Sequence, residues 1–566
     1  MSRWSRVLSL AMLLPAAAAA AAAQAAPRML PLKHKPQPTT GAITAADLMT
    51  RLYIFADDSM QGREAGTEGN VKGTDYIAAE AKRMGLIPAG DDGTYFQTIP
   101  LKTRAFDTTS TFTVGGATIA AFSGYLPLGG DSLVNAALPV VYGGLLGDTL
   151  HEITDAQAAG KLVVFTTPPG FSFGRIRRLG SPLKSAAAVA IAALDSLPPR
   201  FLGFLRSPRT FVDDNVQPAP ATLLISNAVA AKLFAGSIDS LAVGAAGNTA
   251  SVALRYVIAP VPFPARNVVG IVRGSDPKLA GEYVAIGGHN DHLGVGRAVD
   301  HDSIMIWNHV VRPEGADDGG KQATPEQQAH VDSLLAAYRK AHPGMDRADS
   351  IYNGADDDGS GSVSVLEVAQ RIATLKVKPK RSLLFVWHVG EEKGLLGSRF
   401  FTDHPTVPRD SIVAQLNMDM VGRGDASDET GRTKDGVALH GSPSYLQLVG
   451  SRRLSTELGD LVEAVNKSGK HNLTFDYSLD ADGHPSNIYC RSDHYEYARY
   501  GIPIVFFTTG LHSDYHQVTD EPEYIDYDHM ARVVNLVEDV AVHVANLDHR
   551  VVVDHPKPDP NGACRQ

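Results

Sequence analysis

The chain has 566 residues, of which 44% are hydrophobic and 20% charged, a composition that excludes a disordered or collagen-like protein. Its 52 basic and 62 acidic residues leave a formal net charge of −10, so the overall electrostatics do not favour nucleic acid as a partner. At roughly 150 residues per domain, we expect about two to four domains.

The N-terminal segment has the pattern of a secretory signal peptide. Arg3 and Arg6 precede an alanine-rich apolar run and a small-residue site around Ala23-Gln24-Ala25. We therefore expect residues 1–25 to be cleaved and the protein to be exported, periplasmic or extracellular, without stable membrane insertion. An uncleaved anchor is the alternative, although alanine is only weakly hydrophobic and no basic stop-transfer segment follows.

The next part of the chain predicts a flexible leader over residues 26–43 and then helical structure, with a helix in Gly69 to Gly85. Between residues 112 and 260 short β-like runs alternate with Gly and Pro, which indicates a smaller domain inserted into a larger one. Within it, the alanine-rich runs at residues 185–194 and 228–234 are predicted to be helices. The larger domain is expected to span residues 44–111 and 261–548.

From Asn267 onward, short apolar runs that predict strands alternate with helical patterns. The predicted strands are residues 267–272, 283–288, 382–388, 412–418 and 503–508, and the predicted helices are residues 362–374, 395–402 and 527–547. This alternation predicts an α/β fold with a mixed central sheet covered by helices on both faces. Such sheets place their ligand sites at the carboxyl ends of the strands.

Two segments depart from this rhythm. Residues 299–349 form an extra insert, with a helix that starts near Thr324-Pro325. Residues 549–566, with three prolines among them, predict a disordered tail. Only two cysteines occur, Cys490 and Cys564; neither lies in a nucleophile motif, and the sequence does not decide whether they pair.

Chemistry-bearing residues gather in five loops, most of them after predicted strands. No H-E-x-x-H, P-loop or G-x-S-x-G motif occurs. The five loops are His289 to Gly294, Asn353 to Gly361, Gly390 to Gly394, Asn417 to Gly422 and Asp514 to Gln517. One such loop is weak evidence, because surface loops favour Asp and Gly. Five together, each with a possible metal ligand, indicate a metal site.

The residue types fit a pair of zinc ions. Two Zn²⁺ ions roughly 3.5–4 Å apart need a bridging carboxylate to screen their repulsion. Three carboxylates and two neutral imidazoles would complete the coordination, and the loops supply Asp357, Glu392, Asp419, His289 and His516. Glu391, next to a ligand but unable to point the same way, suits the role of general base.

These loops resemble those of metallopeptidase family 28, the co-catalytic di-zinc exopeptidases. The resemblance runs from the Gly62-Arg63-Glu64-Ala65-Gly66-Thr67 segment to about Leu547, with the five motifs in family order. It implies the zinc-exopeptidase fold, which is phosphorylase/hydrolase-like. The inserted residues 112–260 are similar to a protease-associated domain, with a much weaker sequence signal.

Carried over residue by residue, the resemblance assigns the metal ligands. It implies that His289, Asp357 and Asp419 bind one zinc ion. The second ion would be bound by Asp357, Glu392 and His516, with Asp357 as the bridge. Residues 299–349 are inserted in the sequence between the first ligand, His289, and the bridge, Asp357, so both ends of the insert should lie near the metals. We therefore expect the insert to form part of the substrate-pocket wall.

The resemblance also implies two supporting roles. Glu391 would be the general base, and Asp291 would orient the ligand imidazole of His289. The family usually has Asn where this chain has Asp358, so the choice of bridge among Asp356, Asp357 and Asp358 stays open.

The remaining histidines are interpreted as packing or hydrogen-bonding residues: His292, His388, His494 and His512. His512 competes with His516 as a ligand, and the Tyr-His-Gln context favours His516. The Ser492-Asp493-His494 segment is a weaker candidate for the wall of the site.

The expected function is a secreted zinc-dependent aminopeptidase that uses a metal-activated water on peptide substrates. Three alternatives stay open at this stage. A glutamate-carboxypeptidase-like enzyme would share the metal residues, and a glutaminyl cyclase would use a single zinc ion. A non-catalytic binding ectodomain is the third, although such relatives have lost ligands that this chain keeps.

Overall fold

The computed structural model describes residues 32–148, 150–168, 183–197, 199–213, 218–344, 347–423, 429–432, 438–440 and 444–566. The predicted signal peptide, residues 1–25, and the first part of the predicted leader lie outside these ranges. Within them, no helix combines the length and the apolar character needed to cross a membrane.

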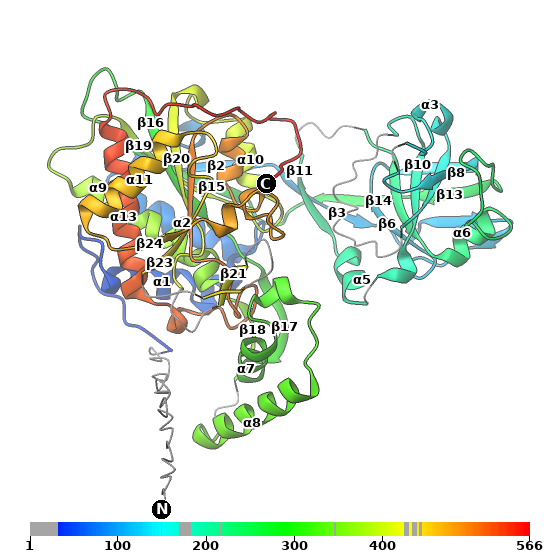
Figure 1. Ribbon diagram of the computed structural model, residues 1–566, viewed down its shortest axis with the longest axis horizontal. Coiled ribbons are helices and arrows are strands. Elements are labelled where there is room, and N and C mark those ends of the chain that lie inside the picture. Colours follow the sequence, from blue (N-terminus) through cyan, green and yellow to red (C-terminus); the bar gives the residue numbers. More distant parts are fainter. Residues whose placement is uncertain are drawn as a thin grey trace, which may run out of the picture.

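A nine-stranded mixed sheet organises the larger of the two bodies in Figure 1. Its order is β1 (Ile87–Pro88), β15 (Ala265–Val272), β19 (Ser382–His388), β16 (Tyr283–His289), β20 (Ile412–Met418), β25 (Ile504–Thr508), β23 (Tyr445–Val449) and β24 (Thr474–Asp476), with β2 (Phe96–Ile99) also paired to β15. The four strands from β19 to β25 run parallel. All five strands predicted from the sequence belong to this sheet.

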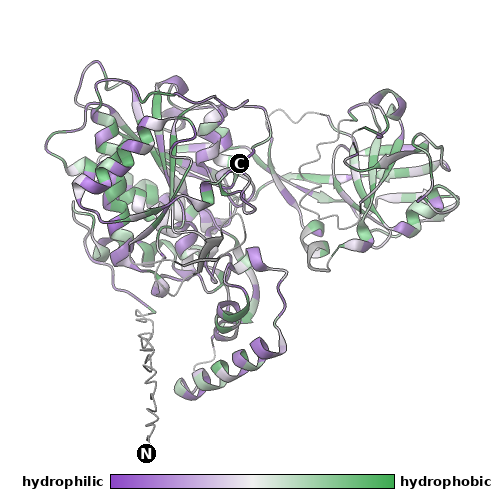
Figure 2. Cartoon of the chain, in the orientation of Figure 1, coloured by the Kyte–Doolittle hydropathy of each residue, from purple (hydrophilic) through white to green (hydrophobic). Residues whose placement is uncertain are grey.

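Helices cover both faces of this sheet, which confirms the predicted α/β class. On β19, Leu383, Phe385 and Trp387 belong to one core while Leu384 and Val386 belong to another, because alternate side chains of a strand point to opposite faces. The first core includes residues of α1 (Ala45–Phe55), α2 (Glu68–Arg83), α9 (Gly361–Thr374), α11 (Thr456–Gly469) and α13 (Tyr527–Asn546), and the second includes residues of α10 (Leu396–Asp403) and α12 (His494–Ala498). In Figure 2 the central strands are accordingly mainly green.

The smaller body in Figure 1 is built on a five-stranded and a four-stranded sheet. The first contains β6 (Tyr125–Gly129), β12 (Ala221–Ile225), β10 (Ala188–Ala192), β9 (Leu162–Thr166) and β8 (Val140–Leu145); the second contains β5 (Ala117–Thr118), β4 (Thr111–Val114), β13 (Ala250–Leu254) and β7 (Leu133–Leu138). A three-stranded ribbon lies between the two bodies: β11 (Arg209–Val212), β3 (Leu101–Phe106) and β14 (Tyr256–Pro260).

The helix predicted over residues 185–194 is wrong. The segment forms β10, which pairs in parallel with β9 and β12, and all five of its residues are buried. Small alanine side chains fit a sheet that is covered on both sides, so these distant pairings override the helix propensity of alanine. The other alanine-rich run does form a helix, α6 (Asn227–Leu233).

The insert forms a hairpin that carries helices. Its strands β17 (Gly294–Asp300) and β18 (Ala348–Tyr352) pair antiparallel, and between them lie α7 (His301–Val311), η4 (Gly315–Asp318) and α8 (Pro325–Ala341). The predicted start of α8 is confirmed, because Thr324 caps the helix in a reciprocal pair of bonds with Gln327.

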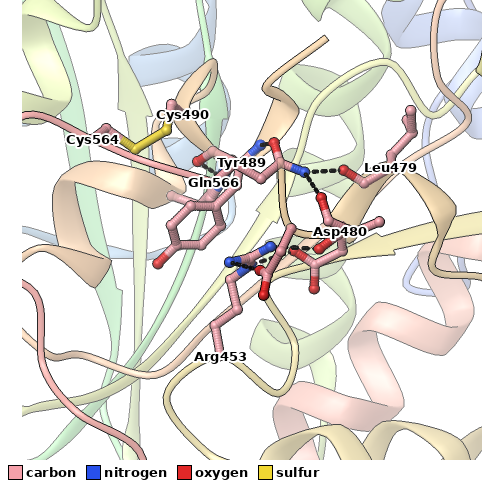
Figure 3. The surroundings of a disulfide bond; sticks show 10 residues. Arg453, Leu479, Asp480, Tyr489, Cys490, Cys564 and Gln566 are labelled. Atoms are coloured by element: carbon pink, nitrogen blue, oxygen red, sulfur yellow. Dashed lines mark hydrogen bonds and ion pairs between the residues drawn. A yellow bond between two sulfur atoms is a disulfide. The ribbon is translucent and has the colours of Figure 1, made fainter. Parts of the chain in front are cut away.

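The C-terminal tail contains no helix or strand after α13, but the prediction of a disordered tail is wrong for its final residues. Cys564 forms a disulfide with Cys490, and the Gln566 side chain accepts a hydrogen bond from the Tyr489 amide (Figure 3). The same side chain donates a hydrogen bond to the carbonyl oxygen of Ala481. A bond between residues 74 positions apart leaves no local sequence pattern, so composition alone could not predict it.

The disulfide should contribute measurably to stability. We expect the double variant Cys490→Ser/Cys564→Ser to lose about 2–4 kcal/mol of unfolding free energy, because the bond restricts a long loop of the unfolded chain. Thermal denaturation with and without reductant measures this. Reductant should lower the midpoint of the native protein and leave that of the variant unchanged; equal midpoints for the two unreduced proteins would contradict the prediction.

Candidate metal centre

The parallel strands bring the predicted loops to one edge of the large sheet. His289 is the last residue of β16, and Asp419 follows β20 directly. Glu391 and Glu392 follow β19 after a two-residue turn. Because β16, β19 and β20 are parallel neighbours, these side chains share the carboxyl edge that the sequence indicated.

The bridge residue comes from a different element. Asp357 lies in the short turn η5 (Ala355–Ser360), which leads directly into α9. His289 Nε2 lies 3.1 Å from Asp357 Oδ1 and 3.7 Å from Asp419 Oδ1. These three buried residues form one group able to hold a metal ion.

A second group lies on the other side of Asp357. His516 Nε2 is 3.0 Å from Asp357 Oδ2 and 3.0 Å from Glu392 Oε2. The first group approaches Oδ1 of Asp357 and the second approaches Oδ2. One carboxylate is therefore shared by the two groups, which is the arrangement that a bridging ligand requires.

His292 also belongs to this second group, although the sequence was interpreted as giving it a packing role. Its Nδ1 lies 2.7 Å from Glu392 Oε1 and 3.8 Å from Asp357 Oδ2. Together with Asp357 and Glu392 it forms a set that could hold a metal ion. The sequence signal that could have found it is its position three residues after His289, in the same loop.

Unsatisfied polar atoms indicate that the centre is built for cations. Among the described residues, His289 Nε2, Glu392 Oε1 and both ring nitrogens of His292 are buried and make no hydrogen bond of normal geometry, although His289 Nε2 and His292 Nδ1 lie close to carboxylate oxygens. Buried polar groups are normally paired, so an unpaired set that converges on shared carboxylates fits a metal site. The donor set, imidazole nitrogen and carboxylate oxygen, is the one that zinc accepts.

The choice among the three consecutive aspartates is clear from their contacts. Asp358 accepts hydrogen bonds from the amides of His289 and Gly361, at 2.8 and 2.9 Å. Asp356 accepts one from the Gly422 amide, at 2.6 Å, and lies 3.1 Å from His512 Nε2. Both carboxylates are thereby occupied by backbone amides or by His512, and Asp357 alone of the three belongs to the two ligand sets.

The resemblance implied that Asp291 orients the His289 ring, and its carboxylate lies within ion-pair distance of that ring but makes its hydrogen bonds elsewhere. Its carboxylate lies 3.8 Å from His289 Nδ1, and it is the backbone carbonyl of Asp291 that approaches this nitrogen, at 3.1 Å. The carboxylate instead accepts hydrogen bonds from the amides of Gly390 and Glu391, at 2.7 and 3.2 Å. Asp291 therefore fixes the loop that carries Glu391 and so helps to position the expected base.

The other three histidines make hydrogen bonds or ion pairs away from the two ligand sets. His388 Nε2 lies 3.0 Å from the Tyr497 hydroxyl, and His494 Nε2 lies 2.8 Å from the carbonyl oxygen of Tyr489. His512 faces Asp356. The preference for His516 over His512 thus agrees with their positions.

Two supporting residues were not predicted in these roles. Asp520 accepts hydrogen bonds from the amides of Asp356 and Asp357, at 2.9 and 3.0 Å, and so holds the turn that presents the shared carboxylate. Ser492 donates to Asp419 Oδ2 at 2.6 Å. Asp520 stands four residues after His516, and a search for acids that follow the fifth loop could have found it.

The surroundings of the two neighbouring glutamates shift their pKa values in opposite directions. Burial raises the pKa of Glu391 well above its ordinary value, and the carboxylates of Glu392 and Asp419 raise it further. For Glu392 burial has the same effect, but His516 and His292 outweigh it and lower the pKa to about 2. The carboxylate that faces two imidazoles therefore has the lower pKa of the two, and Glu391 has the higher proton affinity.

A pocket opens beside the two ligand groups. It is lined by Asp357, Glu391 and Asp419 at one end, and its other walls are largely apolar, formed by Met420, Leu479, Ile488, Phe506 and Leu511. Arg491 and Tyr515 complete the wall together with smaller residues. A molecule in this pocket would place its reacting atoms against the expected metal ligands.

Residues 327–541 match the sequence profile described as peptidase family M28. This part of the chain is a peptidase family M28 domain. The matched stretch includes four of the five expected ligands, Asp357, Glu392, Asp419 and His516, and also Glu391. The match begins after His289. The structure places this residue at the end of β16, which belongs to the same sheet as the strands of the matched stretch.

Several curated proteins are similar to the M28 region. Leucine aminopeptidase 1 of Aspergillus oryzae is 28% identical over 200 residues, which cover 34% of this chain and 47% of that protein. Leupeptin-inactivating enzyme 1 of Streptomyces exfoliatus is 39% identical over 77 residues, 13% of this chain and 18% of that protein. The chain spans about half the length, or less, of these relatives.

Solved structures that match this chain include an aminopeptidase from Aneurinibacillus sp. strain AM-1. It is 17% identical, has a TM-score of 0.48, and the match covers 91% of this chain and 97% of that one. A zinc aminopeptidase from Bacillus subtilis is 15% identical with a TM-score of 0.43, over 89% and 95% of the two chains.

Proposed function

We propose that this protein is a zinc-dependent aminopeptidase that removes N-terminal residues from peptides. The observation that carries the proposal is the shared position of Asp357, whose two carboxylate oxygens face two separate ligand groups. The peptidase family M28 match and the relatives named leucine aminopeptidase support the same reaction class.

Two zinc ions fit the residues present. His289, Asp357 and Asp419 would hold one ion, and Asp357, Glu392 and His516 the other, with His292 beside the second group. When bound, the ions would polarise the scissile carbonyl and activate a water molecule. Asp358, Asp356 and Asp520 would keep the surrounding loops in place through their amide hydrogen bonds.

Glu391 is the group that we assign to proton transfer. Its carboxylate Oε2 lies 4.0 Å from His289 Nε2, and Glu391 also lines the pocket, so it borders both the metal ligands and the space that a substrate would occupy. It would accept the proton of the attacking water and deliver it to the leaving amine. The hydrogen bonds from the Gly390 and Glu391 amides to Asp291 would hold it at that position.

The pocket favours the amino end of a peptide over the carboxyl end. A free N-terminal ammonium group would lie near the carboxylates of Glu391 and Asp419 that line it. A terminal carboxylate needs a free cation, but the guanidinium of Arg491, the cation among the described lining residues, is paired with Asp317. This contrast supports an aminopeptidase over a glutamate-carboxypeptidase-like enzyme.

A substrate scan tests the proposed reaction. We expect the zinc-loaded protein to hydrolyse amino-acyl reporter substrates with a free amine, to fail on the same substrates with an acetylated amine, and to lose activity on treatment with a chelator. Restored activity after zinc is added back completes the test. Equal hydrolysis of free and blocked substrates, or full activity after complete metal removal, would contradict it.

We also propose that the protein acts outside the cytoplasm. Disulfides such as that between Cys490 and Cys564 persist in oxidising compartments, in agreement with the signal-peptide pattern of residues 1–25. Mass spectrometry of the mature protein from its native host should find an N-terminus near residue 26. Recovery of the intact N-terminus would contradict cleavage.

A further inference from the structure

Arg491 is held in the pocket by a residue from the insert. Its Nη1 lies 2.5 Å from Asp317 Oδ2 and its Nη2 lies 3.2 Å from Asp317 Oδ1, so two parallel bonds join the two side chains. The same Nη2 donates to the Tyr515 hydroxyl at 3.1 Å. The guanidinium is thus occupied by a carboxylate in the geometry it would use to bind a carboxylate of a ligand.

The insert reaches this position through a close backbone approach. Asp317 lies in η4, where the amide of Ala316 donates to the carbonyl oxygen of Tyr515 at 3.0 Å. Gly315 has φ of 55°, and a Cβ at this residue would lie only 2.5 Å from the same oxygen. A glycine therefore allows η4 to pack directly on the loop that also carries His516.

The apolar walls of the pocket offer no charged partner to a charged group of a ligand. Leu479, Ile488, Phe506 and Leu511 are buried apolar residues, and Arg491 is the cation among the described lining residues. An apolar side chain would lose its contact with water against these walls at no electrostatic cost. An acidic side chain would have to displace Asp317 from Arg491 or lie beside a second carboxylate, and both are unfavourable.

We propose that Asp317 is a specificity-determining residue, which neutralises Arg491 and so makes the pocket select uncharged apolar side chains at the peptide N-terminus and reject acidic ones. The inference rests on the proposed aminopeptidase function, because it assigns this pocket to the N-terminal side chain. It gives the insert a defined task in substrate selection.

The test is the Asp317→Asn variant, which keeps the shape of the side chain and removes its charge. With Leu and Glu reporter substrates, the ratio of kcat/KM for Glu to that for Leu should rise at least about tenfold over the native protein, the size expected when a charge-assisted hydrogen bond becomes available to the substrate. The matched control is Asp332→Asn, an exposed residue of α8 in the same insert, which should leave the ratio unchanged.

A double variant tests whether Arg491 is the side chain that binds the acidic group of the substrate. In the double variant Asp317→Asn/Arg491→Met the gain on the Glu substrate should disappear, because the freed guanidinium is gone. An unchanged ratio in Asp317→Asn, or a gain that survives in the double variant, would overturn the inference. If Asp332→Asn changed the ratio as much as Asp317→Asn does, the inference would also be overturned, since removal of any negative charge from the insert would then explain the effect.

Binding provides a readout that does not depend on turnover. Calorimetry of the zinc-loaded protein with free glutamate and free leucine should show tighter glutamate binding in Asp317→Asn than in the native protein, by about tenfold or more. Failure to gain glutamate affinity overturns the inference. Absence of hydrolysis of every reporter by the native protein would instead overturn the proposed function, so the two failures are distinguishable.

Discussion

The Glu391→Gln variant should retain its zinc and lose about 10²–10⁴-fold in kcat, the usual contribution of a general base. The amide has nearly the shape of the carboxyl group but cannot accept a proton from water. The residue belongs to neither ligand group, so the metal content should not change. Steady-state kinetics and elemental analysis of the same preparation measure both quantities.

The control for this variant is Glu326→Gln, the same chemical change at an exposed residue of α8. It should leave kcat within experimental error. If Glu391→Gln kept activity near that of the native protein, the assignment of the base would be wrong. If it lost zinc together with activity, Glu391 would have to be counted among the ligands.

Asp357→Ala should abolish the paired metal centre. The residue faces both ligand groups, so its removal takes one ligand from each and leaves the two ions without a carboxylate between them to screen their repulsion. Loss of a residue that only supports a ligand typically costs about 10–100-fold in metal affinity, and loss of a shared ligand should cost more. Elemental analysis after dialysis should find fewer than two zinc ions, and hydrolysis should fall to background.

Asp332→Ala serves as the control, since it removes an equal charge from an exposed site on the insert. It should bind the same amount of zinc as the native protein. Two zinc ions that remain bound to a folded Asp357→Ala protein would contradict the bridging role, and circular dichroism shows whether the variant is folded.

The sequence was most informative where structure is local and repetitive. The predicted bounds of β19 and β20 equal those observed, because each is an unbroken run of residues that favour a buried strand. Most of the five loops could be placed on one edge of a sheet for the same reason, since the direction of parallel strands follows from their alternation with helices. Local pattern therefore sufficed to gather the main candidates.

Contacts between distant residues set the limit of such predictions. The alanine-rich run of β10 is compatible with helix or strand until its neighbours β9 and β12 are known. The tail could not be expected to be fixed at Cys564 without knowledge of its pairing with Cys490. In each case a partner far along the chain decided the outcome.

The same limit applies within the metal centre. The family resemblance implied that the carboxylate of Asp291 orients His289, but the loop directs the hydrogen bonds of this carboxylate to the amides of the Glu391 turn. His292 was interpreted as a packing or hydrogen-bonding residue, and its approach to Glu392 makes it a possible ligand. Side-chain direction, which spacing does not specify, accounts for both differences.

The central claim is that residues far apart in the sequence hold two metal ions that share Asp357. Anomalous X-ray diffraction from crystals of the zinc-loaded protein, measured on both sides of the zinc absorption edge, tests it directly. We expect two peaks roughly 3.5–4 Å apart, one beside His289 and Asp419 and one beside Glu392 and His516, with Asp357 between them. A single peak, or peaks away from these side chains, would contradict the account.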